Sequence, residues 1–326
     1  MDIAQHGYTV HTAPFFPLYA FLLRPAGDDL VAMALWGVVL SNIAFLLALC
    51  LLFRLTEAQY GLRTARVIVW LTAFSPATPY FSAVYSESVF LLAFAATLRC
   101  LHQKRWAAAA LCGFLAALTR SAGVLIFAGL CVQYGYEFFK SKRGLEATPI
   151  AQSKHEWFWQ SAAVLAPLAG FLLAQFLIAR QVGSATQSIA SHQEYFRALT
   201  YPWMPLVLDF WDIVTLNEFH LVMLLNFGAT FLALFLLWKY RSIQPISYSV
   251  MLSGLLLMQL TYSHYSIPRT QSSLRLLATM IPFLQPLSAE IAAIHWPPLR
   301  RATAWGIVLL TAALSSYIFG QKQFLG

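Results

Sequence analysis

Charged residues are scarce in this chain of 326 residues. Only 10% of the residues are Asp, Glu, Lys or Arg, whereas 59% are hydrophobic and 15% aromatic, and the mean hydropathy is +0.64. An ordinary soluble domain has about 25% charged residues. So few charges cannot cover a soluble body of this size, which excludes a soluble cytosolic enzyme, a disordered tail and a nucleic-acid-binding domain. The composition predicts an all-α integral membrane protein with several crossing helices.

The sequence also lacks the usual signatures of metal and nucleotide sites. Its 4 cysteines lie in apolar stretches and none has a CxxC partner, so neither a disulfide framework nor a zinc site is expected. A glycine-rich phosphate loop is missing as well. We therefore expect no metal and no cofactor. The net charge of +8 does not indicate a nucleic-acid partner, because Lys and Arg stand in short clusters between apolar runs.

Apolar stretches long enough to cross or enter a bilayer fill most of the chain, which we treat as one polytopic domain over 1–326. A crossing helix needs roughly 20 residues. Some stretches are shorter and are followed almost directly by the next, which predicts broken or re-entrant helices around a cavity. The expected segments are 30–53, 67–82, 85–100, 106–119, 121–139, 157–179, 219–238, 244–262, 274–294 and 302–320.

The distribution of basic residues predicts the orientation. Two thirds of the 21 Lys and Arg fall in one set of loops, which the positive-inside rule places in the cytoplasm. The opposite, outer side then holds the external loop 1–29, the turns near 80–86, 120 and 263–273, and the loop 180–218. An outer N-terminus has no helix before it to carry it across. We therefore expect that a first transmembrane helix is missing from this chain.

Glu87 is the most conspicuous ionisable residue, because it begins an apolar run with Ser86 and Ser88 on either side. Ionisable residues inside apolar segments are costly and indicate function. Two interpretations stay open. The group can be an N-cap, since hydroxyls and a carboxylate are favoured at a helix start. It can also face a substrate cavity on the outer side.

Cationic residues lie on the same outer side. Arg120 stands between two apolar runs. An arginine at that depth needs an anionic partner, either a carboxylate such as that of Glu87 or a phosphate. The alternative is an interface arginine that extends toward water. His264, Arg269 and Arg275 gather near the ninth segment, which departs from the usual charge rule. We expect a bound phosphate to explain them, with Arg120 and Arg275 in one outer cavity beside Glu87.

Several blocks, read in order, resemble the PIG-V family, the GPI mannosyltransferase 2 family with its prokaryotic relatives. The stretch 15–19 (FFPLY) and the stretch 85–88 (YSES) are fairly specific in combination. The stretches 3–8 (IAQHGY), 75–77 (SPA) and 119–121 (TRS) match too, and 273–275 (SLR) matches more weakly. Together these blocks extend over most of the chain.

The resemblance implies a polytopic GT-C glycosyltransferase with an active site on the outer face. Such a protein moves a sugar, typically mannose, from a polyprenyl- or dolichyl-phosphate carrier to a hydroxyl of a lipid or glycan acceptor. A carboxylate acts as base and cations hold the departing phosphate. The implied partners are the donor, the acceptor and membrane lipids, and the implied location is the bacterial inner membrane, or the endoplasmic reticulum membrane in a eukaryote. The expected substrate-binding residues are His6, Tyr8, Phe16, Tyr19, Tyr85, Ser86, Ser88, Arg120, His264, Arg269 and Arg275.

One departure from the family pattern concerns the base. The family has a Trp-Asp pair several residues before the block at 3–8, and that position falls before Met1. Asp2 and Glu87 are the remaining candidate bases, and an arginine-paired carboxylate is a poorer base. We therefore expect slow or absent sugar transfer by this chain. Two other functions stay open: a transporter or lipid flippase, which would place its polar groups near the midplane, and a non-catalytic scaffold.

Overall fold

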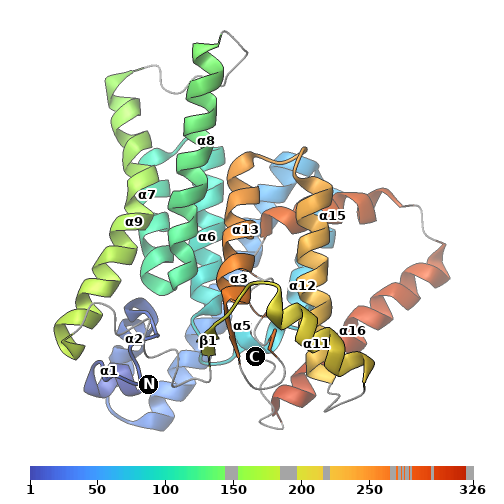
Figure 1. Cartoon of the computed structure of the whole chain (residues 1–326), viewed down its shortest axis with the longest axis horizontal. Coiled ribbons are helices and arrows are strands. Elements are labelled where there is room, and N and C mark those ends of the chain that lie inside the picture. Colours follow the sequence, from blue (N-terminus) through green and yellow to red (C-terminus); the bar gives the residue numbers. More distant parts are fainter. Residues whose placement is uncertain are drawn as a thin grey trace.

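The computed structural model describes residues 1–143, 153–183, 197–215, 221–264, 269, 270, 273, 275, 279, 281–294 and 297–320. Within these ranges the protein is a bundle of helices with one short antiparallel ladder (Figure 1). In chain order the elements are α1 (Asp2–His6), α2 (Pro17–Leu23), α3 (Leu30–Tyr60), α4 (Leu62–Ala73), α5 (Thr78–Ser82), α6 (Glu87–His102), α7 (Trp106–Thr119), α8 (Val124–Lys142), α9 (Lys154–Val182), β1 (Arg197–Leu199), α11 (Met204–Val214), α12 (Leu221–Tyr240), α13 (Ile246–Thr261), β2 (Tyr262–His264), α15 (Ile281–Ala293) and α16 (Pro298–Gly320), with 3-10 turns at Arg24–Ala26 and Ser121–Gly123.

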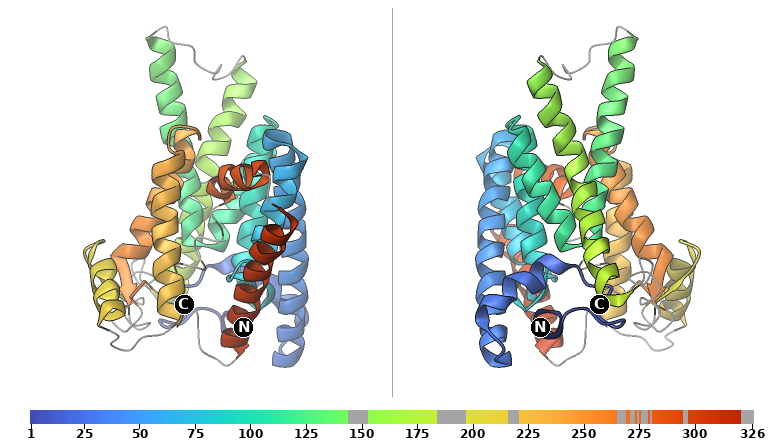
Figure 2. Two further views of the ribbon diagram at one scale, coloured as in Figure 1. Left: turned by 90° about the vertical axis from the view of Figure 1, so that its right-hand side faces the viewer. Right: turned by 90° about the vertical axis from the view of Figure 1, so that its left-hand side faces the viewer.

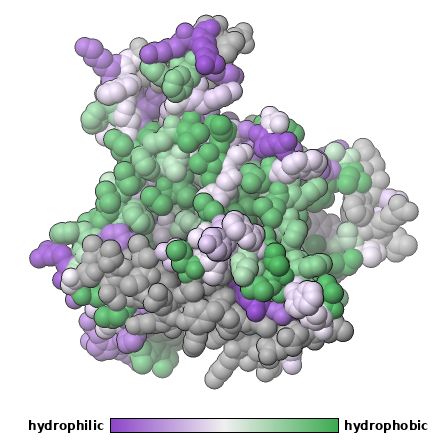
Figure 3. Space-filling model, in the orientation of Figure 1, coloured by the Kyte–Doolittle hydropathy of each residue, from purple (hydrophilic) through white to green (hydrophobic). Residues whose placement is uncertain are grey.

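The two ends of the bundle differ in character. α8 and α9 extend beyond the other helices at one end, whereas residues 1–29, α11 and the β1–β2 ladder lie at the opposite end (Figures 1 and 2). On the face shown in Figure 3, apolar residues cover much of the region between these ends, and hydrophilic residues gather at the tips of α8 and α9. These two tips carry Lys140, Lys142 and Arg143 at the end of α8 and Lys154 at the start of α9, the cluster predicted to be cytoplasmic. We call the opposite end the outer end.

Four helices in the described part of the chain are long and apolar enough to cross a membrane. They are Leu30–Tyr60, Ser121–Lys142, Lys154–Val182 and Met223–Tyr240, and shorter apolar helices are Trp106–Thr119, Ile246–Thr261 and Ala302–Tyr317. The expected stretch 67–82 contains two helices, α4 and α5, separated by a turn that includes Pro76. That break matters for function because it leads directly into Glu87.

Local sequence signals account for the helix ends. The Asp29 carboxylate caps α3 by accepting from the Val31 and Ala32 amides, at 3.2 Å each, as an N-cap aspartate should. Ser153 caps α9 by accepting from the Glu156 amide at 3.1 Å. α9 ends at Gly183, which adopts the left-handed conformation with φ of 83°. α9 therefore begins and ends with standard caps, although Pro167 lies inside it.

The core joins α3, α4 and the helices from α6 to α9 to α13 and α15. α6 packs between α3 and α7, α7 against α9, α13 against α8, and α15 against α4. Phe81 of α5 is fully buried and stacks on Phe45 of α3 with ring centroids 4.8 Å apart. Buried aromatic and aliphatic side chains of α3, α5, α6 and α13 form one continuous cluster. This cluster holds the short helix α5, and hence the start of α6, in place.

The α7–α9 contact depends on small residues. A Cβ atom on Gly170 of α9 would lie 2.3 Å from the carbonyl oxygen of Phe114 in α7. Helices in membranes approach closely through such residues. We expect Gly170→Ala to lower the free energy of unfolding by about 1–3 kcal/mol, because overpacking must push the helices apart. Denaturant titration in mixed micelles measures this change.

Gly135 of α8 is the matched control, because a Cβ atom there would meet nothing within 4 Å. Gly135→Ala should stabilise the protein by up to about 1 kcal/mol, since alanine has the higher helix propensity. Equal effects of the two substitutions would show that the close contact between α7 and α9 does not contribute to stability.

Candidate functional site

The carboxylate of Glu87 lies at the first turn of α6 and is 1% exposed. The sequence before it folds back on itself. The Ser88 hydroxyl donates to the Phe81 carbonyl, and the Tyr85 amide donates to the Ala83 carbonyl at 2.8 Å. Phe81 is itself fixed by its stacking on Phe45. The turn between α5 and α6 is therefore rigid, and it presents Glu87 at a fixed position.

Arg120 reaches Glu87 from a break between two helices. α7 ends at Thr119, and the Arg120 backbone is extended, with φ of −153° and ψ of 149°. The chain then turns sharply, since a Cβ atom on Gly123 would lie 2.4 Å from the Cα atom of Ala117. Only glycine allows the start of α8 to pack so closely on the end of α7. The break directs the Arg120 guanidinium to Oε1 of Glu87.

Arg275 binds the same oxygen from the far end of the sequence. Its Nε donates to Oε1 of Glu87. The guanidinium carbon also lies 5.4 Å from the ring centroid of Tyr80 and 5.2 Å from that of Tyr85. The two rings meet edge to face at 5.5 Å. Cation–π contacts of this kind add to the ion pair, so Arg275 is held by three side chains at once.

Glu87, Arg120 and Arg275 form what we call the arginine cluster. Glu87 is the one acidic partner of either arginine among the described residues, so the cluster holds two positive charges against one negative charge. The arginine side chains are 15% and 19% exposed, whereas that of Glu87 is 1% exposed. Part of each arginine side chain is therefore accessible from outside the protein. The forked donors of arginine match phosphate and carboxylate groups.

A second ionic group lies at the outer end, and we call it the α11 clamp: Asp209 and Asp212 of α11 with Arg269 and Thr270. The Asp209 carboxylate is 0% exposed and accepts from the amides of Arg269 at 2.9 Å and Thr270 at 2.8 Å. It also accepts from the Thr270 hydroxyl at 2.6 Å. Arg269 pairs with Asp212. The predicted substrate residue Arg269 thus lies in this clamp and is compensated there, apart from the arginine cluster.

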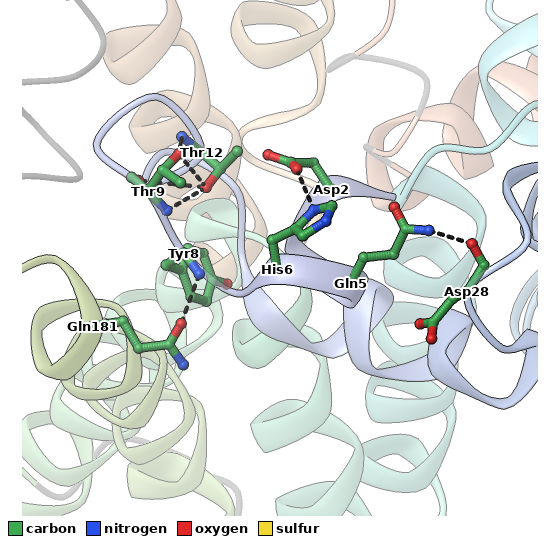
Figure 4. A network of polar contacts seen from close by, with 8 residues as sticks. All are labelled: Asp2, Gln5, His6, Tyr8, Thr9, Thr12, Asp28 and Gln181. Carbon is green, nitrogen blue, oxygen red and sulfur yellow. Dashed lines mark hydrogen bonds and ion pairs between the residues drawn. The ribbon is translucent and has the colours of Figure 1, made fainter.

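The N-terminal segment is ordered by polar contacts across the outer end (Figure 4). Nδ1 of His6 lies 3.0 Å from a carboxylate oxygen of Asp2, and both side chains are largely exposed. The Tyr8 amide donates to Gln181 of α9 at 2.6 Å, and the Tyr8 hydroxyl donates to the Phe15 carbonyl at 2.9 Å. Burial raises the pKa of the Tyr8 phenol well above its usual range. The two candidate residues Asp2 and His6 thus form a pair with each other.

Tyr19 connects the N-terminal segment to the arginine cluster. Its hydroxyl lies 2.8 Å from that of Ser41 in α3, and the Ser41 hydroxyl donates to the Tyr85 carbonyl at 3.4 Å. Burial raises the pKa of Tyr19 to about 12, so the phenol stays protonated at neutral pH. Phe16 is buried, with its ring 5.8 Å from that of Phe171 in α9. Both side chains fix α2 against the bundle.

The remaining predicted residues fall in different settings. Ser86 is the N-cap residue of α6 but makes no side-chain cap bond, and Ser88 is fully buried on the Phe81 carbonyl. His264 pairs with Arg197 through the backbone of the β2–β1 ladder, and its side chain lies outside the described part of the structure. The binding roles of all these residues stay predictions, as does the expected absence of a metal.

Sequence reasoning placed Tyr80, Asp209 and Asp212 on the outer side, within 80–86 and 180–218, but it did not predict their partners, and it did not single out Ser41. Tyr80 and Ser41 carry no sequence signal, because a tyrosine and a serine in apolar helices are common. The α11 clamp, in contrast, did leave a signal in the sequence. Asp209 and Asp212 are three residues apart on one side of a helix whose other side is apolar. In a chain with so few charges, that pattern was sufficient to suggest a buried partner.

The fold is similar to that of a solved membrane protein. The crystal structure of ArnT from Cupriavidus metallidurans bound to undecaprenyl phosphate superposes with a TM-score of 0.53 at 12% sequence identity. The match covers 93% of this chain and 53% of that chain, so this chain spans about half the length of ArnT. No protein-family model and no curated protein matches the sequence.

This likeness confirms the predicted fold class. The protein has a predominantly helical, GT-C-like membrane fold and is a multi-pass membrane protein. The resemblance to the PIG-V family in particular stays a prediction.

Proposed function

We propose that the protein is a membrane glycosyltransferase that takes a sugar from a polyprenyl-phosphate carrier at the outer end of the bundle. The observation that carries this proposal is the arginine cluster, in which two arginine side chains that are partly exposed share one buried carboxylate. Its unbalanced positive charge suits a phosphate that arrives from the lipid phase. The fold likeness to ArnT, whose structure contains undecaprenyl phosphate, supports the same donor class.

In the proposed reaction a hydroxyl of a lipid or glycan acceptor attacks the anomeric carbon of the sugar. The bond between that carbon and the phosphate oxygen breaks, and polyprenyl phosphate leaves with the bonding electrons. Arg120 and Arg275 stabilise the charge that develops on the leaving phosphate. The hydroxyl proton passes to a base, for which Asp2, next to His6, and Glu87 are the candidates.

Within the arginine cluster, Glu87 fits a positioning role better than that of the base. Both guanidiniums bind its Oε1, and its carboxylate is almost fully buried. An acceptor hydroxyl would have to displace an arginine to reach that oxygen. The other oxygen, Oε2, has no hydrogen-bond partner among the described residues, but it is buried, so a hydroxyl could reach it only if the packing around it opened. Glu87 therefore holds the two phosphate-binding groups together. Mannose as the sugar, membership in the PIG-V family and the bacterial inner membrane as the location are the finer parts of this proposal, and they rest on the resemblance described above.

Binding in lipid nanodiscs tests the donor class. Undecaprenyl phosphate should bind saturably, whereas undecaprenol, which has the same chain without the charge, should bind only as bulk lipid does. Native mass spectrometry of the protein extracted from nanodiscs measures how much of each lipid remains bound. Equal retention of the two lipids would refute a phosphate site. Transfer from radiolabelled polyprenyl-phosphate mannose, compared with carriers of other sugars, then tests the mannose assignment.

A further inference from the structure

The helix α11 has its polar and apolar faces reversed relative to a helix on a water-soluble protein. Val207, Phe210, Trp211 and Val214 are exposed, although all four are large and apolar. The opposite face, with Asp209 and Asp212, is buried. A surface helix in water turns its apolar stripe inward and its charges outward. The environment that covers the outward face of α11 must therefore be apolar.

The buried face is firmly attached to the protein. Asp209 accepts three hydrogen bonds from Arg269 and Thr270, and Arg269 bridges to Asp212. Just before α11, β1 pairs with β2 in register from Arg197 with His264 to Leu199 with Tyr262. The orientation of α11 is thus determined by contacts on its polar side, and the exposure of the apolar side is a fixed feature of the fold.

The outward face continues into the surface of α12. The ring of Phe210 lies 6.4 Å from that of Phe227 in α12, which in turn lies 4.7 Å from that of Phe231. Phe231 is exposed on one of the helices that can cross the membrane. Before α11, the exposed rings of Tyr201 and Trp203 stack at 5.1 Å. Tyrosine and tryptophan concentrate where the bilayer meets water.

We propose that α11 lies in the plane of the outer leaflet and that its outward face binds lipid at the boundary between headgroups and acyl chains. Helices with one apolar aromatic face bind membranes in this way. Two observations favour lipid over a second copy of the chain or another protein. The face carries no charged residue, and it is continuous with the apolar surface of a membrane-spanning helix. Figure 1 shows α11 across the outer end of α12.

This placement links the bilayer surface to the arginine cluster. The inward face of α11 binds Thr270, and Arg275 follows five residues later along the chain. The depth of α11 in the outer leaflet therefore sets the depth at which Arg275 binds the phosphate of a membrane-bound carrier. Only this consequence rests on the proposed function. The lipid contact itself does not require sugar transfer.

Nitroxide accessibility tests the lipid contact on the full chain in phosphatidylcholine nanodiscs. The four native cysteines, Cys50, Cys100, Cys112 and Cys131, are replaced by alanine. Spin labels are then attached at Val207→Cys or Trp211→Cys. Two labels serve as references: Asp28→Cys on the exposed N-terminal segment and Leu172→Cys on the exposed face of the crossing helix α9.

Labels on α11 should be relaxed by molecular oxygen and protected from a water-soluble nickel chelate. Their oxygen-to-nickel ratio should exceed that at Asp28→Cys several-fold and approach that at Leu172→Cys. A ratio equal to that at Asp28→Cys would place α11 in water and overturn the proposal. Protection from both reagents would show that protein covers the face, which also overturns it. Donor binding by the same variants, measured separately, shows whether the proposed function holds independently.

Discussion

Replacing Glu87 by glutamine is expected to destabilise the protein by about 3–5 kcal/mol, because it leaves two largely buried arginine side chains without a counter-charge. Both Arg120 and Arg275 bind the oxygen that loses its charge. The loss is large relative to the total stability of a typical domain, which is about 5–15 kcal/mol. Denaturant titration in mixed micelles, followed by tryptophan fluorescence, measures it.

Glu57→Gln is the matched control. Glu57 forms an ion pair with Arg54 at 3.3 Å, but both side chains are substantially exposed. Such surface pairs contribute about 0–1 kcal/mol. A second test uses the double variant Glu87→Gln with Arg275→Gln, which removes one of the uncompensated charges and should recover part of the loss. If the double variant is as unstable as the sum of the single variants, the ion pair is not the source of the effect.

Replacing Arg275 by alanine is expected to weaken binding of a polyprenyl-phosphate donor by about 2–5 kcal/mol, the cost of truncating one partner of a buried charge pair. That corresponds to a rise in Kd of about 30-fold or more. The folded state should survive, because Glu87 keeps its pairing with Arg120 and the cluster becomes neutral. Titration of undecaprenyl phosphate into nanodiscs gives the affinity.

The control for Arg275→Ala is Arg24→Ala, since Arg24 is an exposed arginine on the predicted outer N-terminal segment. It should leave the Kd within about twofold, as an exposed charge in solvent contributes little. Arg275→Lys should bind better than Arg275→Ala, because the ammonium keeps the charge but loses the planar fork. An unchanged Kd for Arg275→Ala would show that the phosphate binds elsewhere.

The scarcity of charge made the main features of the site readable from sequence. Glu87, Arg120 and Arg275 attract notice because few ionisable residues interrupt the apolar runs. Their contact with one another depends on the break between α7 and α8, and on how residues far apart in sequence pack together. The spacing of these three residues along the sequence does not predict their contacts. Tyr80 illustrates the limit, since only the packed structure brings its ring beneath the guanidinium of Arg275.

The fold class followed from composition, but the helical structure within the loop 180–218 did not. The loop 180–218 was expected as an external loop, and part of it folds as α11. The reversed amphipathic pattern of α11 explains the difficulty. Val207, Phe210, Trp211 and Val214 form a helical stripe that is too short to be recognised as a membrane span. Whether that stripe faces core or lipid is decided by the partners of Asp209 and Asp212, which come from a distant segment.

The sequence separations within the arginine cluster also set an order of events during synthesis. Arg120 is 33 residues from Glu87, and Arg275 is 188 residues from it. At a synthesis rate of 5–20 residues per second, Arg275 emerges roughly 10–40 s after Glu87. The early helices can therefore enter the bilayer as a neutral Glu87–Arg120 pair. The excess positive charge reaches the membrane only after the helices from α3 to α13 have been synthesised.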